Sequence, residues 1–131
     1  MKVKFSIFYL LSFIFLGAMT LKGENTGNPK ANPRAVVTNG NARFTVLTPE
    51  MIRIEYSDKG VFEDRATFTV INRNLDVPQY STSEDATFLY IETGKLHLKY
   101  RKGTNPKTLP ASSANLSITM NHNGREVLWY P

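Results

Sequence analysis

Apolar and polar residues alternate along most of the segment 43–101, and residues 60–65 interrupt the alternation. A period of two places every second side chain on one face of a strand, which is the pattern of a half-buried antiparallel sheet. Ile52, Ile54 and Tyr56, for example, fall on one face of a single run. An amphipathic helix needs a period near 3.6, and no helix of ordinary length fits this pattern. The alternation predicts an all-β fold.

The alternating runs and the turn residues between them predict a series of short strands. We expect strands near residues 42–47, 51–56, 67–72, 88–93, 95–101 and 116–120, and a final one that begins near Glu126. Gly94 indicates a tight hairpin, and Asn123-Gly124 is the strongest hairpin signal in the chain. The segment 103–115 contains two prolines and predicts a long loop. Together these elements predict one antiparallel β-sandwich over residues 39–131.

Residues 1–23 have the layout of a secretory signal peptide. Lys2 and Lys4 precede an apolar run that extends from Phe5 to Met19, and polar residues follow it. The run is about fifteen residues long, whereas a membrane-spanning helix needs about 20. A retained N-terminal anchor is the competing interpretation. We expect an exported protein, periplasmic or extracellular, with no stable membrane span after cleavage.

Residues 24–38 contain Gly27, Pro29, Pro33 and several asparagines, a composition that predicts a flexible linker. The chain has no cysteine, so no disulfide supports an exported domain of this size. The whole sequence carries a net charge of +5, but three lysines lie in residues 1–23. The basic cluster 99–102 is more typical of the solvated end of a strand than of a nucleic-acid site. No nucleic-acid partner is expected.

The sequence predicts no catalytic residue, no metal site and no cofactor. Acid–base catalysis needs two carboxylates at a fixed separation, but the acidic pairs 63–64 and 84–85 are adjacent in sequence. Adjacent side chains on an extended chain point in opposite directions, so neither pair forms an acid–base couple. His97 and His122 are isolated, and their spacing matches no metal-binding motif.

Aromatic residues are the candidate binding groups. Trp129, Tyr130 and Phe62, with Tyr80, could stack on the face of a sugar ring. Core packing or an interdomain contact is the alternative role for these residues. Two aromatics and a leucine also stand at the C-terminal end of the sequence, where polar residues are usual. We therefore expect the sandwich to be incomplete at its C-terminal end and the natural sequence to continue past Pro131.

Several segments, taken in order, resemble the N-terminal domain of a known enzyme family. The similar segments are residues 43–49, 51–57, 60–65, 70–73, 89–93, 96–103, 115–117 and 129–131. Each is degenerate by itself, and their order and spacing over residues 37–131 carry the resemblance. The family is glycoside hydrolase family 31, which contains α-glucosidases and α-xylosidases.

The resemblance implies a galactose-mutarotase-like β-sandwich that packs against a (β/α)8 barrel of the same polypeptide. In the family, two aspartates of the barrel act as nucleophile and acid–base in retaining hydrolysis of α-glucosides or α-xylosides. No position of this chain corresponds to either aspartate. The chain is thus expected to be a non-catalytic part of an exported α-glycosidase, which binds α-linked oligosaccharides through the parent enzyme. A free-standing carbohydrate-binding or adhesive module and a purely structural spacer domain are the alternatives.

Overall fold

The computed structural model describes residues 27–107 and 112–131, so the predicted signal peptide lies outside the described residues. The regular elements are the 3-10 helix η1 (Pro33–Ala35) and the strands β1 (Val36–Asn39), β2 (Ala42–Thr48), β3 (Met51–Tyr56), β4 (Tyr80–Glu84), β5 (Phe88–Thr93), β6 (Leu96–Arg101), β7 (Leu116–His122) and β8 (Arg125–Trp129). None of the helices in this part of the chain is long and apolar enough to cross a membrane.

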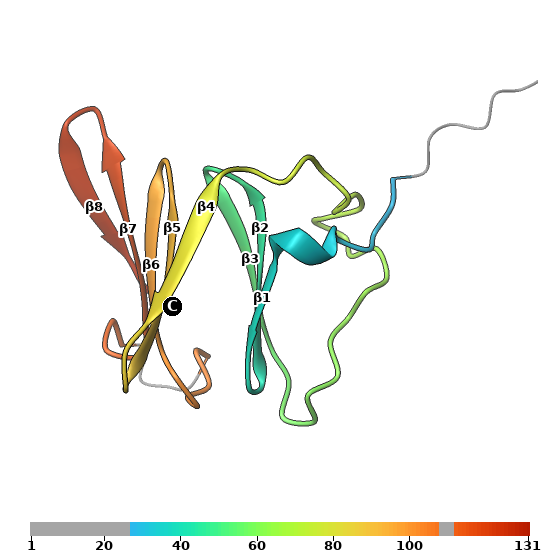
Figure 1. Ribbon diagram of the computed structural model, residues 1–131, viewed down its shortest axis with the longest axis horizontal. Helices are drawn as coiled ribbons and strands as arrows, with labels where there is room; N and C mark the ends of the chain where they lie inside the picture. Colours follow the sequence, from blue (N-terminus) through green and yellow to red (C-terminus); the bar gives the residue numbers. More distant parts are fainter. Residues whose placement is uncertain (1–26, 108–111) are drawn as a thin grey trace, which may run out of the picture.

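The strands form two antiparallel sheets, and the predicted all-β sandwich-like fold is confirmed. Sheet A has the order β1-β2-β3, and sheet B has the order β4-β5-β6-β7-β8. Neighbours in each sheet are consecutive in sequence, so both sheets are simple meanders. Figure 1 shows the sheets as two layers, joined by the long segment between β3 and β4.

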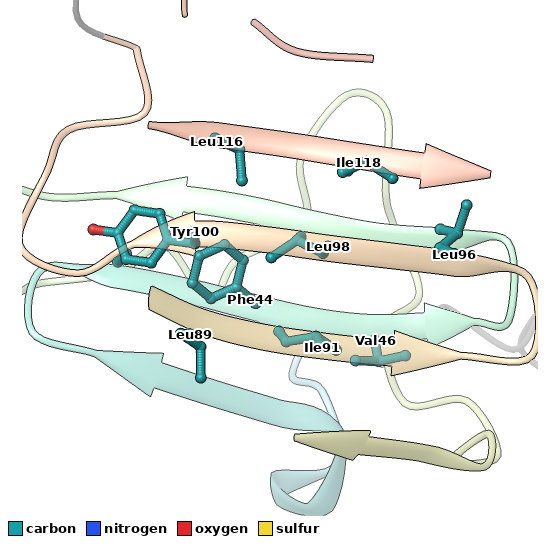
Figure 2. Close-up of a cluster of buried hydrophobic side chains, with 10 residues drawn as sticks. Phe44, Val46, Leu89, Ile91, Leu96, Leu98, Tyr100, Leu116 and Ile118 are labelled. Carbon is teal, nitrogen blue, oxygen red and sulfur yellow. The ribbon is translucent and has the colours of Figure 1, made fainter. Parts of the chain in front are cut away.

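The core lies between the two sheets. It consists of alternate side chains along β2, β5, β6 and β7, which point inward. Its large members are Phe44 and Val46 of β2, Leu89 and Ile91 of β5, Leu96, Leu98 and Tyr100 of β6, and Leu116 and Ile118 of β7 (Figure 2). The rings of Phe44 and Tyr100 meet with their centroids 5.1 Å apart and their planes tilted by 59°. The Tyr100 hydroxyl donates a hydrogen bond to Thr104 O at 2.6 Å, so its polar end is also satisfied.

The predicted turns are confirmed. The β5–β6 hairpin turns at Gly94-Lys95, where the Thr93 hydroxyl accepts from the backbone N–H of Leu96 at 2.8 Å. The β7–β8 hairpin turns at Asn123-Gly124, with φ values of 53° and 77°. Positive φ at both central residues is the condition for the type I′ turn that matches the twist of paired strands.

The linker predicted over residues 24–38 is wrong at its C-terminal end. Residues 33–35 form η1, and β1 then pairs with β2, so that Val36 lies opposite Thr45. The Tyr80 hydroxyl also donates to Arg34 O at 2.6 Å, which attaches this segment to β4. A strand of four residues is too short to show an alternating pattern. Its pairing with β2, rather than its composition, makes it a strand.

The strand predicted over residues 67–72 is also wrong, and β4 was not predicted. In the segment 57–79 no regular strand forms, and Phe68 and Ile71 are exposed. The guanidinium of Arg73 donates instead to Glu63 O and Arg65 O and holds this segment as an irregular loop. β4 is polar on both faces and mostly exposed, so hydrophobic alternation does not mark it.

The burial difference between two phenylalanines gives a direct test of this core. Phe44 is fully buried, whereas Phe68 is fully exposed. We expect Phe44→Ala to lower the free energy of unfolding by about 3–5 kcal/mol, because it leaves a cavity beside Tyr100. Phe68→Ala is the matched control and should change it by less than about 0.5 kcal/mol. Urea denaturation followed by circular dichroism measures both, and equal losses would contradict the placement of the core.

Candidate functional site

Three adjoining hollows follow the outer edge of β3, and we call them together the β3-edge groove. Their volumes are about 240, 180 and 340 Å³, and Ile54 lines all three. Other residues that line the groove are Ile52, Tyr56, Phe62, Lys107, Leu116, Met120 and Trp129. The two smaller hollows are mainly apolar, whereas the hollow of about 340 Å³ is also lined by Arg53, Glu55 and Glu63. The groove is therefore hydrophobic beside sheet B and charged at its Phe62 end.

The groove exists because β3 is the outermost strand of sheet A while sheet B continues past it to β8. Met120 of β7 and Trp129 of β8 line the same hollow as Ile54 of β3. The Ser57 N–H donates to Asn41 O at 2.9 Å, which makes these two residues a hydrogen-bonded pair. Antiparallel pairs alternate, so the N–H and C=O groups of Ile54 and Tyr56 face the unpaired edge. The groove therefore combines apolar side chains with free main-chain donors and acceptors.

The structure places the three predicted aromatic residues differently. Trp129 is 46% exposed and lines two of the hollows, and Phe62 lines the third. The two rings thus border one groove. Ile54 and Tyr56 line both the hollow beside Trp129 and the hollow beside Phe62. Tyr130 is 48% exposed but lines none of the three hollows. The sequence selected these residues because they are aromatic. Only the fold shows that Tyr130 lies outside the groove that Trp129 and Phe62 line.

β8 extends the apolar surface beyond the groove. All five of its residues are exposed, and Val127, Leu128 and Trp129 are large hydrophobic side chains. In the described part of the chain β8 pairs only with β7, so one of its edges is open. Large exposed apolar side chains next to an open strand edge are typical of a surface that another protein segment covers.

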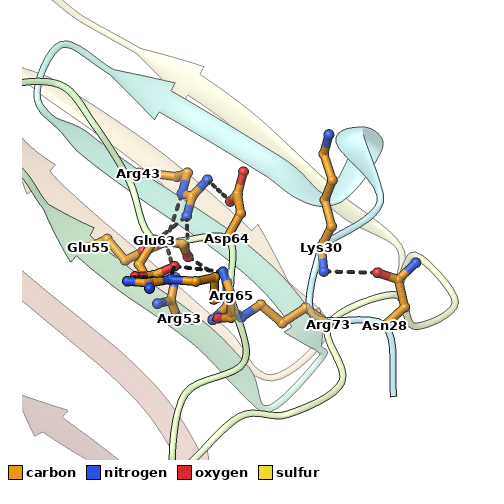
Figure 3. A network of polar contacts seen from close by, with 9 residues as sticks. All are labelled: Asn28, Lys30, Arg43, Arg53, Glu55, Glu63, Asp64, Arg65 and Arg73. Atoms are coloured by element: carbon orange, nitrogen blue, oxygen red, sulfur yellow. Dashed lines mark hydrogen bonds and ion pairs between the residues drawn. The ribbon is translucent and has the colours of Figure 1, made fainter. Parts of the chain in front are cut away.

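A network of arginines and carboxylates lies beside the groove, on the outer face of sheet A (Figure 3). Arg43 of β2 and Glu55 of β3 are cross-strand neighbours and form two hydrogen bonds, of 2.7 and 3.0 Å. Arg43 also donates to Asp64 at 2.6 Å, and Arg53 pairs with the same Glu55 carboxylate. Burial disfavours ionised Glu55, but hydrogen bonds and charges from the two arginines outweigh it and lower its pKa.

Phe62 connects this network to the groove. The Arg43 guanidinium lies 4.7 Å from the centroid of the Phe62 ring, a cation–π distance. The Arg43–Glu55 pair has a signal in the sequence, because the two residues carry opposite charges on the polar faces of two consecutive predicted strands. The stacked ring and the contact with Asp64 depend on the path of the loop and carry no such signal.

Arg73 is the most buried charged residue of the network. Arg73 is only 2% exposed. Its guanidinium donates hydrogen bonds to Glu63 O at 2.7 Å and to Arg65 O at 2.6 Å. Its Nε is buried without a hydrogen-bond acceptor among the described residues. Burial, and then the charges of Arg53 and Arg43, lower the pKa of Arg73 from its ordinary value. Sequence analysis did not identify this residue.

The acidic pairs considered in the sequence have structural contacts. Hydrogen bonds from Arg65 lower the pKa of Glu63 to about 2, and Asp64 pairs with Arg43. Asp85 accepts from the backbone N–H groups that precede and begin β5, which lowers its pKa. The lowered pKa values of Glu63 and Asp85 favour the ionised form, which is the opposite of what a general acid requires.

The two histidines lie apart. His97 of β6 pairs with Glu92 on the neighbouring strand, and His122 lies next to the β7–β8 turn beside Asn123. Within residues 27–107 and 112–131 no group of three His, Asp or Glu side chains could hold a metal ion. The contacts of both histidines are those of surface residues at strand pairs and turns.

No family model matches this chain, and no curated protein matches its sequence. The resemblance to glycoside hydrolase family 31 consequently stays a prediction, which depends on the order of the segments named above. The groove and the network are the features of the structure on which a functional argument can be built.

The lowered pKa of Glu55 predicts a specific dependence of stability on pH. A carboxyl group with a lowered pKa in the folded state contributes stability above its unfolded pKa, near 4.5, and loses it as the pH falls through the folded value. Glu55→Gln should lower the free energy of unfolding at pH 7 by about 1–3 kcal/mol. The free energy of unfolding of this variant should also decline less steeply as the pH falls below about 5.

Urea denaturation at a series of pH values measures this effect. Glu126→Gln is the matched control, because Glu126 is exposed on β8. The control should keep both the stability at pH 7 and the acid decline of the unmodified chain. A Glu55→Gln variant whose stability falls with acid as steeply as the control would contradict the structural role of the Arg43–Glu55–Arg53 contacts.

Proposed function

We propose that this chain is the N-terminal, non-catalytic β-sandwich of an exported α-glycosidase related to glycoside hydrolase family 31. Retaining hydrolysis of α-glucosides or α-xylosides would then belong to a (β/α)8 barrel of the same polypeptide. The ordered resemblance over residues 37–131 and the two-sheet antiparallel fold both support this assignment. The observation that carries it is the β3-edge groove, an apolar surface with a free strand edge.

The composition of the groove favours contact with another protein segment. Its hollow of about 180 Å³ is lined mainly by apolar side chains such as Leu116, Pro106 and Trp129. A bound segment would bury these side chains and supply partners for the free main-chain groups of β3. Sheet A would gain a strand, and the inner face of sheet B beside β3 would be covered. A packed barrel or its connecting chain fits this requirement.

The carboxylates of the described residues agree with a non-catalytic role. Retaining glycosidases use two carboxyl groups about 5 Å apart, one of which must be protonated to act as the acid. Glu55, Glu63 and Asp64 are instead paired with arginines. In this proposal the domain supports and positions the barrel, and chemistry takes place outside it.

The first test is enzymatic. The purified chain should release no sugar from aryl α-glucosides or α-xylosides, because in this proposal the acid and the nucleophile belong to the barrel. The reading frame downstream of codon 131 should encode a (β/α)8 barrel with two aspartates at the ends of its strands. Reproducible turnover by the clean 131-residue chain, or unrelated sequence after an intact stop codon, would overturn the proposal.

A contrast between two lengths of the protein tests the role of the groove. In the 131-residue chain Trp129 is half exposed, so we expect Trp129→Ala to change the free energy of unfolding by less than about 1 kcal/mol. In a polypeptide that includes the barrel, the same substitution should cost about 3–5 kcal/mol, because the ring is then buried. Equal effects in both proteins would show that no barrel covers the groove.

A free-standing carbohydrate-binding module is the second candidate, and one observation favours it. Trp129 and Phe62 border the same groove, and aromatic rings along a groove can stack on successive sugar faces. Maltose- or xyloglucan-type oligosaccharides should then bind the 131-residue chain, and Trp129→Ala should abolish the binding.

Isothermal titration calorimetry measures this binding, and Tyr130→Ala is the matched control. Tyr130 is an adjacent aromatic of nearly the same exposure as Trp129, but it lies outside the groove, so its loss should leave affinity unchanged. A flat titration at millimolar sugar removes the support for this candidate.

A further inference from the structure

A separate cavity of about 280 Å³ lies between η1, β1, β2 and the loop 57–79, and we call it the arginine cavity. The residues that matter for its chemistry are Lys30, Arg43, Arg73, Asp64 and Thr45. It shares Arg43, Asp64 and Arg73 with the network described above, but none of the apolar side chains of the β3-edge groove line it. Its lining is therefore distinct in both position and polarity.

The charge of the lining is strongly positive. Lys30, Arg43 and Arg73 carry three positive charges, and Asp64 is the only acidic residue among the residues that line the cavity. Asp64 is already bonded to Arg43 at 2.6 Å. The exposed ammonium of Lys30 has no ion-pair partner in the part of the chain that the structure describes, and only the Lys30 backbone N–H is bonded, to Asn28. Among the lining residues alone two positive charges remain in excess, and Arg43 is also bonded to Glu55, which lies outside the lining.

Arg73 is the least compensated of these groups. Its hydrogen bonds go to two backbone carbonyls, which carry no charge, and its Nε has no acceptor among the described residues. The charges of Glu55, Glu63 and Asp64 reach Arg73 only through space, because these carboxylates are bonded to Arg43 or Arg65. A buried cation without a directly bonded counter-ion is costly, and an anion in the adjoining cavity would offset that cost.

We propose that the arginine cavity binds a small oxyanion through Lys30 and the positive field of Arg43 and Arg73. Guanidinium and ammonium groups together are the usual partners of carboxylate and phosphate oxygens. The volume suits a single such group or a small molecule that carries one. The oxyanion can be free phosphate or the carboxylate of an acidic sugar, and the two share the same recognition chemistry. This inference does not rest on the glycosidase proposal.

The experiment titrates the purified full chain with sodium phosphate, sodium acetate and sodium glucuronate. Ionic strength is held constant with sodium chloride at pH 7, and isothermal titration calorimetry measures affinity. We expect saturable binding with a Kd on the order of a millimolar. Saturation by phosphate alone identifies free phosphate as the ligand, whereas saturation by glucuronate and acetate identifies a carboxylate.

Charge variants of the lining test where the anion binds. Lys30→Ala should weaken binding by about 2- to 5-fold, since one exposed ion pair contributes that much. Asp64→Asn should tighten it several-fold, because it removes the carboxylate that repels the ligand. Lys59→Ala is the control, because Lys59 is an exposed lysine outside the cavity, and it should leave the Kd unchanged.

Lys30 and Lys59 are both exposed, so neither variant should disturb folding, which circular dichroism checks. The proposal is overturned if no anion gives a saturable isotherm. It is also overturned if Lys30→Ala and Lys59→Ala weaken binding equally, since that result would indicate general electrostatic attraction. A gain of affinity in Asp64→Asn together with a loss in Lys30→Ala supports the site.

Discussion

The packing of β2 against the inner face of sheet B is the contact on which the rest of the structure depends. β2 is buried over most of its length, and Phe44 and Val46 contact the apolar layer formed by β5, β6 and β7. Sheet A has three strands and one apolar face, which is stabilised only when it is covered, and this chain has no disulfide to support it. The two sheets are therefore held together mainly by one apolar layer, centred on the Phe44–Tyr100 ring contact.

The unequal width of the sheets explains where the candidate site lies. Sheet A ends at β3, while sheet B continues through β7 to β8. The inner face of the wider sheet consequently remains partly uncovered, and the free edge of β3 borders it. Proteins usually protect such edges with charge, proline or a covering segment. β8 carries charges at its start, in Arg125 and Glu126, but its later residues are apolar and exposed. Residues 127–129 therefore lack the usual protection of an exposed strand edge, as is typical of a surface that contacts another segment.

The sequence predicted the strands that have one buried face. β3 and β5 have the predicted bounds. In β5 the alternation matches buried Leu89 and Ile91, whereas residues 52–56 of β3 are all half-buried because the arginine network covers its polar face. β1 and β4 escaped prediction, since partner strands rather than hydrophobic patterning hold them. The alternation in residues 67–72 was misleading, because Phe68 and Ile71 never reach the core. Hydrophobic alternation therefore predicts a strand where burial causes it, whereas β8, which is exposed throughout, follows from the Asn123-Gly124 turn.

The candidate sites could be predicted to a smaller extent. Residue type selected Trp129 and Phe62, but the groove that joins them requires β3 to lie beside β7 and β8, which are far from it in sequence. The arginine cavity depends on Arg73, whose position is set by two backbone carbonyls rather than by a charged partner. Carbonyl acceptors exist at every residue, so no sequence pattern can mark the two that are used.

β3 connects the groove to the arginine network because its successive side chains point to opposite faces. Ile52, Ile54 and Tyr56 face the core side, while Arg53 and Glu55 face the network, and residues of both faces line the groove at its Phe62 end. The Arg43–Glu55 contact fixes the register of β2 and β3, and Arg43 also holds the Phe62 ring at one end of the groove. A segment that enters the groove would therefore meet side chains that are already ordered. Ordering them costs little on binding, so more of the free energy of apolar burial remains available for association.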